Sequence, residues 1–236
     1  MKDLVIFGIT HFAKLLKYYI ETDDIHQRKV VAFTVSINYI KSSEYLGLPV
    51  VPFEKIESFY PPEKYDILLA IGDRKMNSIR EHFFYDCKAK GYNVASYYHS
   101  SSNLNAEQIG EGNIILFNCY IAPFSIVGNG NLLWDNVTIA HDCIVGDFNT
   151  LSGHADTCGF VKIGNNCYLG KHSLINDRVK VLDSTYVGAK AYVKTDTKEG
   201  DVIVSPRSET LKNIQSISFV QILESMDRRK VIKDDK

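Results

Sequence analysis

The sequence predicts an α/β domain followed by a parallel β-helix, because its two halves follow different patterns. Residues 1–100 alternate short apolar runs with segments of helical periodicity, which is typical of a Rossmann-like βαβ arrangement. Residues 101–206 repeat an aliphatic residue at every sixth position. Residues 207–236 form a third region, in which we expect a closing helix capped by Ser208 and a charged tail.

The first half starts with a strand signal and a helix signal in close succession. The apolar run Leu4–Gly8 predicts a strand. Residues 10–21 carry apolar side chains at helical spacing, and Thr10 can cap that helix. We expect three further strands, at residues 29–35, 65–73 and 93–98. A second helix is expected at residues 75–90. We therefore predict a small open sheet of parallel strands.

The carboxyl ends of these strands are where such sheets bind ligands. The ends of the first and third predicted strands supply our candidates for substrate binding, which are Gly8, Thr10, Gly72 and Asp73. A turn of this kind can hold a phosphate at the N-terminus of the following helix. The turn reads GITHFAK over residues 8–14 and contains a single glycine. The sequence alone leaves open whether this turn binds a nucleotide.

The second half is a hexapeptide repeat. When we step by six residues from Ile109 to Val193, fourteen of fifteen positions are aliphatic, and the exception, Thr157, is β-branched. The residue four positions after each of these is small or medium in size. A period of six fits neither a helix nor a single strand. It predicts a triangular prism of about five coils with eighteen residues each, whose aliphatic side chains point inward and whose coils stack about 4.8 Å apart.

Three histidines fall outside the inward column of this repeat. His141 lies two positions after Ile139, so we expect it at or near the surface of the prism. His154 and His172 are eighteen residues apart and share one register position, so they should stack one coil above the other. The same column contains Asn118, Asn136 and Lys190.

Composition and charge exclude several classes of protein. Lys and Arg number 27 and Asp and Glu number 28, which argues against a nucleic-acid binder that relies on a basic surface. The five cysteines include no CxxC pair, so reduced thiols in a cytoplasmic protein are expected. No apolar stretch approaches the eighteen residues of a membrane span, and the N-terminus lacks the layout of a signal peptide.

These features together resemble the bacterial sugar acyltransferases of the sialic-acid O-acetyltransferase and bacillosamine-pathway N-acetyltransferase type. The matching segments are NVTIAHDCIVGDF, VKIGNNCYLG, GLPVVPFEKI and AIGD, at residues 136–148, 161–170, 47–56 and 70–73. The resemblance implies a left-handed β-helix, a front domain that holds a nucleotide-activated sugar, a homotrimer, and acetyl-CoA in the groove between neighbouring helices, with no metal. The implied reaction is direct N-acylation of an amino sugar for surface-glycan biosynthesis.

The resemblance also implies roles for single residues. His141 and Asp142 match the family motif His-[Asp/Glu]-Cys, in which the histidine is the general base. A histidine with a pKa near neutrality can accept the proton that the attacking group loses, and a carboxylate can fix its tautomer. Asp142 is the candidate carboxylate, with Asp147 or a residue of the next subunit as alternatives. Contacts to CoA are expected from His154 and from two glycines without a Cβ, Gly159 and Gly170.

Other interpretations remain open at this point. Cys143 occupies a small position of its hexad, so a structural role outweighs a nucleophilic one. Acylation of a sugar hydroxyl would use the same base as acylation of an amine. A zinc β-helix of the γ-carbonic anhydrase type would need three imidazoles that converge. A β-helix that serves as a scaffold or sugar sensor would need no base at all.

The chain departs from the family pattern at three places, one of which is the segment FTVSIN at 33–38, where the family has an acidic pair. His11 and Phe12 stand in the first turn where the family has glycine and histidine. The loop IVSPRS at 203–208 keeps only Pro206 of the family's Gly-Val-Pro-Ala, although Arg207 could meet a phosphate of CoA.

Overall fold

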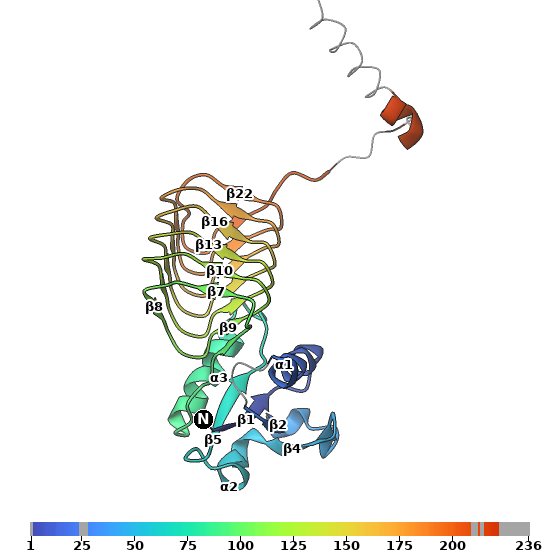
Figure 1. Ribbon diagram of the computed structural model, residues 1–236, viewed down its shortest axis with the longest axis vertical. Helices are drawn as coiled ribbons and strands as arrows, with labels where there is room; N and C mark the ends of the chain where they lie inside the picture. The colour runs from blue at the N-terminus through green and yellow to red at the C-terminus, as the bar shows by residue number, and fades with distance from the viewer. Residues whose placement is uncertain (1, 24–27, 209–211, 213–214, 222–236) are drawn as a thin grey trace, which may run out of the picture. The chain divides into compact units, whose positions relative to one another are not determined.

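The computed structural model describes residues 2–23, 28–208, 212 and 215–221. The chain divides into two units, Met1–Ser205 and Pro206–Lys236. The first unit contains a front domain and a β-helix (Figure 1). In the second unit, residues 216–221 are helical. Ser208, the predicted cap, precedes that helix by eight residues. Much of the predicted closing helix and tail, at 209–211, 213–214 and 222–236, lies outside the described residues.

The front domain is the open parallel sheet that the sequence predicts. Its strands are β1 (Asp3–Phe7), β2 (Val30–Val35), β3 (Glu44–Tyr45), β4 (Leu48–Pro52) and β5 (Tyr65–Leu69), in the spatial order β3-β4-β2-β1-β5. All neighbours pair in parallel except the hairpin β3–β4. The helices are α1 (His11–Thr22), α2 (Ile56–Phe59) and α3 (Ser78–Ala89), with 3₁₀ turns at Ile37–Tyr39 and Phe53–Lys55. Thr10 is the N-cap residue of α1, but its hydroxyl makes no capping hydrogen bond.

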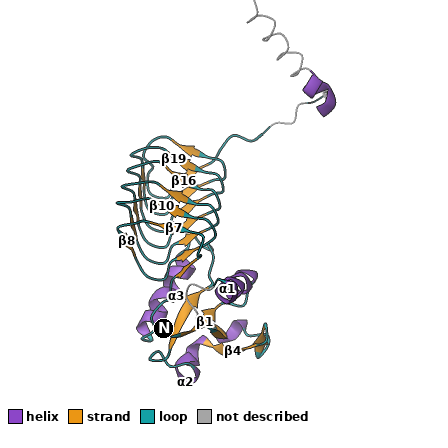
Figure 2. Ribbon diagram, in the orientation of Figure 1, coloured by secondary structure: helices purple, strands orange, loops and turns teal. Residues whose placement is uncertain are grey.

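The second half is a left-handed parallel β-helix with three faces, each a sheet of two-residue strands (Figure 2). The first face contains β6 (Tyr97–Tyr98), β9 (Ile114–Ile115), β12 (Leu132–Leu133), β15 (Thr150–Leu151), β18 (Tyr168–Leu169), β21 (Tyr186–Val187) and β23 (Val202–Ile203). The second contains β7 (Asn103–Leu104), β10 (Tyr120–Ile121), β13 (Thr138–Ile139), β16 (Asp156–Thr157), β19 (Leu174–Ile175) and β22 (Tyr192–Val193). The third contains β8 (Gln108–Ile109), β11 (Ile126–Val127), β14 (Ile144–Val145), β17 (Lys162–Ile163) and β20 (Lys180–Val181).

The β-helix begins earlier than the hexapeptide pattern indicates. We predicted that residues 93–98 form a strand of the front sheet, but β6 pairs with β9 of the β-helix, and Val94 makes only an isolated bridge to Ile67. The pattern hides the first coil because Leu104 and Ile109 are five residues apart instead of six. Both side chains still pack against the core of the helix.

Inward aliphatic side chains and left-handed corners together make the coil. The repeated aliphatic residues form one buried cluster that runs through the helix, as predicted. At the corners from Gly112 to Lys190, one residue adopts a φ between 55° and 67°; the non-glycine examples are Asn118, Phe124, Asn136, Asp142, Phe148, His154, Phe160, Asn166, His172, Arg178, Ser184 and Lys190. Left-handed backbone costs about 1–2 kcal/mol for most residues. It is retained because it lets the corner amide donate to the coil below, as Phe160 N does to His141 O at 3.1 Å.

A buried arginine joins the two domains. Arg80 of α3 is 1% exposed, and burial lowers its pKa to about 9. Its guanidinium donates to the carbonyl of Gly72 in the front domain at 2.8 Å and to the carbonyls of Gly130 and Asn149 in the β-helix at 2.8 and 3.0 Å. Nearby, the Asn77 amide donates to the Cys167 carbonyl at 3.0 Å. The front domain is therefore fixed to the first face of the β-helix.

Candidate functional site

Each coil of the β-helix turns at three corners, which we name after one polar residue each. The His141 corner comprises residues 140–142, 158–160 and 176–178 and follows the second face. The His154 corner comprises residues 134–136, 152–154 and 170–172 and follows the first face. The Asp147 corner comprises residues 146–148, 164–166 and 182–184 and follows the third face.

His141 lies at the surface of its corner and is paired with its neighbour. Its Nδ1 is 2.8 Å from Oδ2 of Asp142, and the two side chains are 55% and 39% exposed. Adjacent residues rarely face each other, but here Asp142 has a φ of 58°, which turns its side chain toward the imidazole. The pair leaves Nε2, the other ring nitrogen, without a hydrogen-bond partner among the described residues.

Gly159 lies one coil after His141, directly beside the imidazole. A Cβ at Gly159 would lie 2.8 Å from Cε1 and 2.9 Å from Nε2 of His141, which is closer than side chains approach one another. The absence of a side chain therefore allows the ring to lie against the backbone. The Gly159 amide donates no hydrogen bond within the described part of the chain, so a donor is available near Nε2.

Three further side chains, from the next two coils, lie at the surface near His141 and Gly159. The ring of Phe160 meets that of His141 edge to face, with 5.2 Å between centroids and 87° between planes. The guanidinium of Arg178 lies 4.2 Å above the Phe160 ring, and its Nε is 3.2 Å from Oδ2 of Asp177. The other oxygen, Oδ1, lies 3.3 Å from the position of the missing Gly159 Cβ. Sequence reasoning missed these residues, although the spacing of eighteen from Asp142 and Gly159 could have found them.

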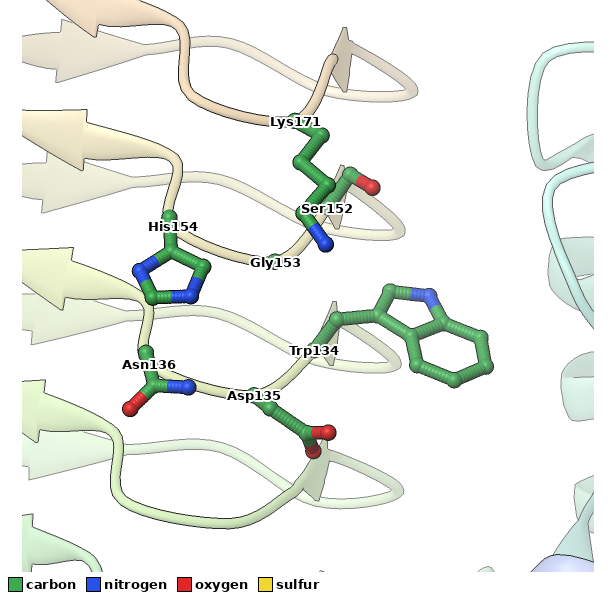
Figure 3. Close-up of a pocket in the computed structure, with 7 residues that line it drawn as sticks. All are labelled: Trp134, Asp135, Asn136, Ser152, Gly153, His154 and Lys171. Carbon is green, nitrogen blue, oxygen red and sulfur yellow. The ribbon is translucent and has the colours of Figure 1, made fainter.

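The His154 corner carries the predicted histidine stack. The rings of His154 and His172 are 4.6 Å apart with 17° between their planes. Below them, the Asn118 amide donates to Asn136 at 2.8 Å, so the column continues as predicted. Beside this column is a surface hollow of about 360 Å³, lined by Trp134, Asp135, Asn136, Ser152, Gly153, His154 and Lys171 (Figure 3).

The other predicted glycine and the alternative carboxylate have structural surroundings. A Cβ at Gly170 would lie 2.5 Å from the backbone nitrogen of Ala189, so the close stacking of coils explains this glycine. Asp147 accepts a hydrogen bond from the amide of Asn129 at 2.6 Å on its own corner. It therefore does not orient His141 within the chain. Whether Gly170 also contacts CoA stays a prediction.

The cysteine of the motif faces the core. Cys143 is fully buried and its thiol lies 3.3 Å from the carbonyl of Cys158. Burial raises the pKa of this thiol, which disfavours the thiolate that a nucleophile needs. This geometry agrees with the structural role expected for Cys143. None of the five cysteines forms a disulfide.

The front domain has a pocket of about 260 Å³ at the carboxyl ends of its strands. Gly8, Thr10 and Gly72 line it, as the position of the strand ends predicts. Asp73 does not; its neighbour Arg74 takes that place. Gly8 has a φ of 129°, and a Cβ there would lie 3.0 Å from the carbonyl oxygen of Ala70. The remaining wall is mostly apolar, formed by Phe7, Ile9, Val35, Ser36, Tyr39, Ala70, Ile71, Ile79 and Phe83.

The three histidines do not converge. His141 lies on one corner, whereas His154 and His172 lie on another, so a single chain does not form the three-imidazole site of a zinc β-helix. Among the described residues, no group of three or more His, Cys, Asp and Glu side chains is arranged to hold a metal ion. Likewise, none of the helices in the described residues is both long and apolar enough to span a membrane.

Comparison with solved structures identifies relatives of the fold. The acetyltransferase domain of PglB from Neisseria gonorrhoeae is 20% identical, with a TM-score of 0.76 over 89% of this chain and 100% of that one. The fold is shared with sugar N-acetyltransferases. A histidine-to-alanine variant of GDP-perosamine N-acetyltransferase from Caulobacter crescentus, in complex with CoA and GDP-perosamine, is 21% identical, with a TM-score of 0.77 over 87% of this chain and 94% of that one.

A third structure agrees with these two. WeeI from Acinetobacter baumannii is 19% identical and has a TM-score of 0.75 over 87% of this chain and 97% of that one. No protein-family model matches the chain, and no curated protein matches it by sequence. The resemblance inferred from the sequence is therefore confirmed at the level of the fold.

Proposed function

We propose that this chain transfers an acyl group from CoA to the amino group of a nucleotide-linked sugar, with acetyl-CoA as the donor. The observation that carries the proposal is the geometry of His141. Its Nδ1 is paired with Asp142 at 2.8 Å, and its Nε2 has no hydrogen-bond partner among the described residues and lies close to the backbone of Gly159. This is the arrangement of a general base whose tautomer is fixed by a carboxylate.

The proton transfers follow from this arrangement. Asp142 accepts a hydrogen bond from Nδ1–H, so Nε2 carries the lone pair. As the amine nitrogen attacks the carbonyl carbon, Nε2 takes its proton, and Asp142 stabilises the imidazolium that forms. The same nitrogen then returns the proton to the departing sulfur. Cys143 is buried, so no acyl-enzyme is required. A base of this type contributes roughly 10²–10⁴-fold to the rate.

The surroundings of His141 fit an acyl-CoA. The thioester supplies the activated acyl group. The amide of Gly159 donates no hydrogen bond among the described residues, so we propose it as the donor to the carbonyl oxygen as negative charge develops there. Because Gly159 has no Cβ, the imidazole of His141 can lie against its backbone, which brings Nε2 close to this peptide.

The front pocket fits the nucleotide end of the acceptor. Its apolar wall suits a base and ribose, while Arg74 and the N-terminus of α1 suit phosphates. Phe12 of α1 packs on Trp134, which lines the hollow at the His154 corner, with 5.3 Å between centroids, and Thr10 just before α1 lines the pocket. We propose that a sugar attached to a nucleotide in the pocket extends along α1 toward this hollow. Three of the similar structures, all of one protein from Caulobacter crescentus, hold GDP-perosamine together with CoA, which supports an amino sugar as acceptor.

The two halves of this site lie on different corners of one chain. The front pocket and its adjoining hollow belong to the His154 corner, whereas the base belongs to the His141 corner. We propose that a homotrimer brings the His154 corner of one copy against the His141 corner of the next. A closed ring of three copies would make three equivalent sites. The location of such an enzyme would be the cytoplasm, where acetyl-CoA and nucleotide sugars are made.

An activity assay tests the proposed reaction. Release of the CoA thiol is measured with acetyl-CoA and a panel of nucleotide-linked sugars that carry an amine or only hydroxyls, with GDP-perosamine as the first probe. We expect transfer to an amine, and the product is checked by mass spectrometry for an added acetyl group. Transfer to hydroxyls alone would change the proposal to O-acylation. No transfer to any sugar of the panel would overturn it.

A mixing experiment tests the shared site. Arg74→Glu disables the front pocket and His141→Ala removes the base. Each variant alone should be inactive. When the two are co-expressed, random assembly leaves about one quarter of the sites with both intact parts if neighbouring copies share a site. Activity near that level supports the trimer, and its complete absence in mixed trimers contradicts a shared site. Light scattering of the wild-type protein measures the mass of the assembly and therefore the number of copies in it.

A further inference from the structure

We infer that Asn77 is a positioning residue, which holds Arg74 at the front pocket so that Arg74 can bind the diphosphate of the nucleotide-linked acceptor. The inference rests on the proposed function, because it takes the pocket as the nucleotide site. It deepens that proposal by naming the residue on which the affinity for the diphosphate depends. The segment that carries it is the turn of residues 72–77, between β5 and α3.

This turn has an unusual backbone. Lys75, Met76 and Asn77 follow one another with φ values of 52°, 49° and 66°, all in the left-handed region. No other segment of the described residues has three such residues in succession. The conformation is unfavourable for lysine and methionine, and it persists only where surrounding contacts hold it. Strain of this kind clusters at ligand-binding segments, which directs attention to the pocket beside this turn.

The side chain of Asn77 is bound to the β-helix and does not cap its own helix. Asn77 is the N-cap residue of α3, where an asparagine usually accepts a hydrogen bond from the helix, but it makes no such bond. Its amide donates to the Cys167 carbonyl at 3.0 Å, and its oxygen accepts from the Thr150 hydroxyl at 2.6 Å and from Nη2 of Arg80 at 3.1 Å. The residue is completely buried. These contacts fix the end of the turn on the β-helix.

The start of the turn is fixed as well. Nη1 of Arg80 donates to the Gly72 carbonyl at 2.8 Å, and the backbone amide of Asn77 donates to the Asp73 carbonyl at 3.1 Å. Arg74 lies between these fixed points, is exposed, and lines the front pocket. Its backbone position therefore depends on the contacts that Asn77 makes. A guanidinium at the wall of a pocket is well suited to a diphosphate, which it can bind through two parallel hydrogen bonds.

A fixed turn should raise the affinity because Arg74 starts close to its bound position. When an arginine on a mobile segment binds a ligand, both the side chain and the segment lose conformational freedom. Here the backbone part of that cost is met when the chain folds, through the buried contacts of Asn77. Lys75 offers a comparison, since it has the same charge on the same turn but is absent from the lining of the pocket.

A double-mutant cycle tests whether Asn77 acts through Arg74. Calorimetry measures the binding of GDP, UDP and dTDP to the wild type, and the nucleotide that binds most tightly is used for the variants. Arg74→Ala should weaken binding at least ~10-fold, because a charge-assisted contact is lost. Asn77→Gly suits the left-handed backbone but removes the side-chain contacts, so it should weaken binding by ~3- to 10-fold. The double variant should stay within about 2-fold of Arg74→Ala.

Kinetics and two further variants separate positioning from a general loss of structure. Asn77→Gly should raise the KM for GDP-perosamine and leave kcat and the KM for acetyl-CoA near their wild-type values. Thr150→Val removes the hydroxyl that donates to Asn77 and leaves the turn itself unchanged, so it should weaken nucleotide binding less, again without adding to Arg74→Ala. It decides the question if thermal melting shows that Asn77→Gly does not fold. Lys75→Ala is the matched control and should bind within about 2-fold of the wild type.

Three results would overturn the inference while the proposed acyl transfer stands. The first is a double variant whose loss is the product of the two single losses. The second is wild-type affinity in Asn77→Gly, or in Thr150→Val if that variant has to decide. The third is a loss in Lys75→Ala equal to that in Arg74→Ala, which would indicate general attraction by charge. If none of the three nucleotides binds the wild type, the assignment of the pocket in the proposed function fails together with the inference.

Discussion

The His141 corner and the His154 corner place histidines on the same β-helix but surround them differently. At the first corner, one imidazole is paired with a carboxylate on Nδ1, and the edge that carries the opposite nitrogen lies against the backbone of a glycine. At the second, two imidazoles stack on each other at 4.6 Å, and no carboxylate pairs with either ring among the described residues. Both corners have the same backbone conformation around these histidines, with left-handed residues at Asp142 and Phe160 on one and at His154 and His172 on the other.

We propose that neighbours, and not the histidine itself, define the base. A general base needs a fixed tautomer and a free lone pair. Of the histidines at these two corners, only His141 is paired with a carboxylate among the described residues. His154 has an open hollow beside it instead, with Trp134 as a flat apolar surface and Asp135 and Lys171 as polar groups, which is suited to binding a ligand. The following variants test this division of roles, with the largest expected effect first.

Loss of the base at the His141 corner should have the largest effect. His141→Gln keeps a polar side chain but removes the titratable nitrogen, so kcat for acetyl transfer should fall by about 10³-fold. His172→Gln is the matched control on the other corner and should stay within about 3-fold of the wild type. The thiol-release assay with GDP-perosamine measures both. Equal losses in the two variants would contradict the comparison.

A methyl group at Gly159 should be almost as damaging without removing any functional group. Gly159→Ala would place Cβ within 2.9 Å of Nε2, so the imidazole must move away from its position. A displacement of about 1 Å in a catalytic group costs roughly 10²-fold in rate. Gly153→Ala is the matched substitution on the other corner, where Cβ would meet only the Asp135 carbonyl, at 3.2 Å. We expect a much smaller loss there, and thermal melting should show that both variants fold.

Replacement of the carboxylate should have an intermediate effect. Asp142→Asn preserves shape and tolerates the left-handed backbone, but it no longer stabilises the imidazolium or selects one tautomer. Because the pair is partly exposed to water, we expect kcat to fall by about 10–100-fold, less than for a buried triad. The KM for acetyl-CoA should hardly change. A rise in KM with an unchanged kcat would instead assign Asp142 to binding.

The smallest effect is expected at the second corner. His154→Gln should raise the KM of a ligand that occupies the adjoining hollow by about 3- to 10-fold, because one contact is weakened. It should leave kcat near the wild-type value. Comparison of the KM for acetyl-CoA with that for GDP-perosamine shows which ligand His154 contacts. A fall in kcat comparable to that of His141→Gln would remove the distinction between the two corners.

Much of the fold could be predicted because the repeat fixes the register. A period of six places Ile139 and Leu151 inside, and a spacing of eighteen stacks His154 on His172. The first coil was missed because one residue is absent between Leu104 and Ile109. Strands β3 and β4 were missed as well, since a short hairpin rich in proline and glycine gives a weak strand signal.

The site could be predicted only in part. His141, Asp142 and Gly159 follow from the motif and the register, but we interpreted Gly159 through CoA and not through the imidazole beside it. The contacts among Phe160, Arg178 and Asp177 depend on the side-chain directions that left-handed corners create. The sequence does not reveal these directions. Arg80 was not recognised because its partners are backbone carbonyls distant in sequence, and carbonyls leave no pattern in the order of residues.

The guanidinium of Arg80 has a consequence for how acceptors are chosen. A single planar group binds the floor of the front pocket through Gly72 and two coils of the β-helix through Gly130 and Asn149. The guanidinium therefore ties the front pocket directly to the β-helix of the same chain. An acceptor that is anchored in the front pocket must itself be long enough for its nucleophile to reach the part of the site on the β-helix. Such an enzyme would thus select acceptors by the distance between their anchored end and their nucleophile. This selection would precede any contact at the reacting atom.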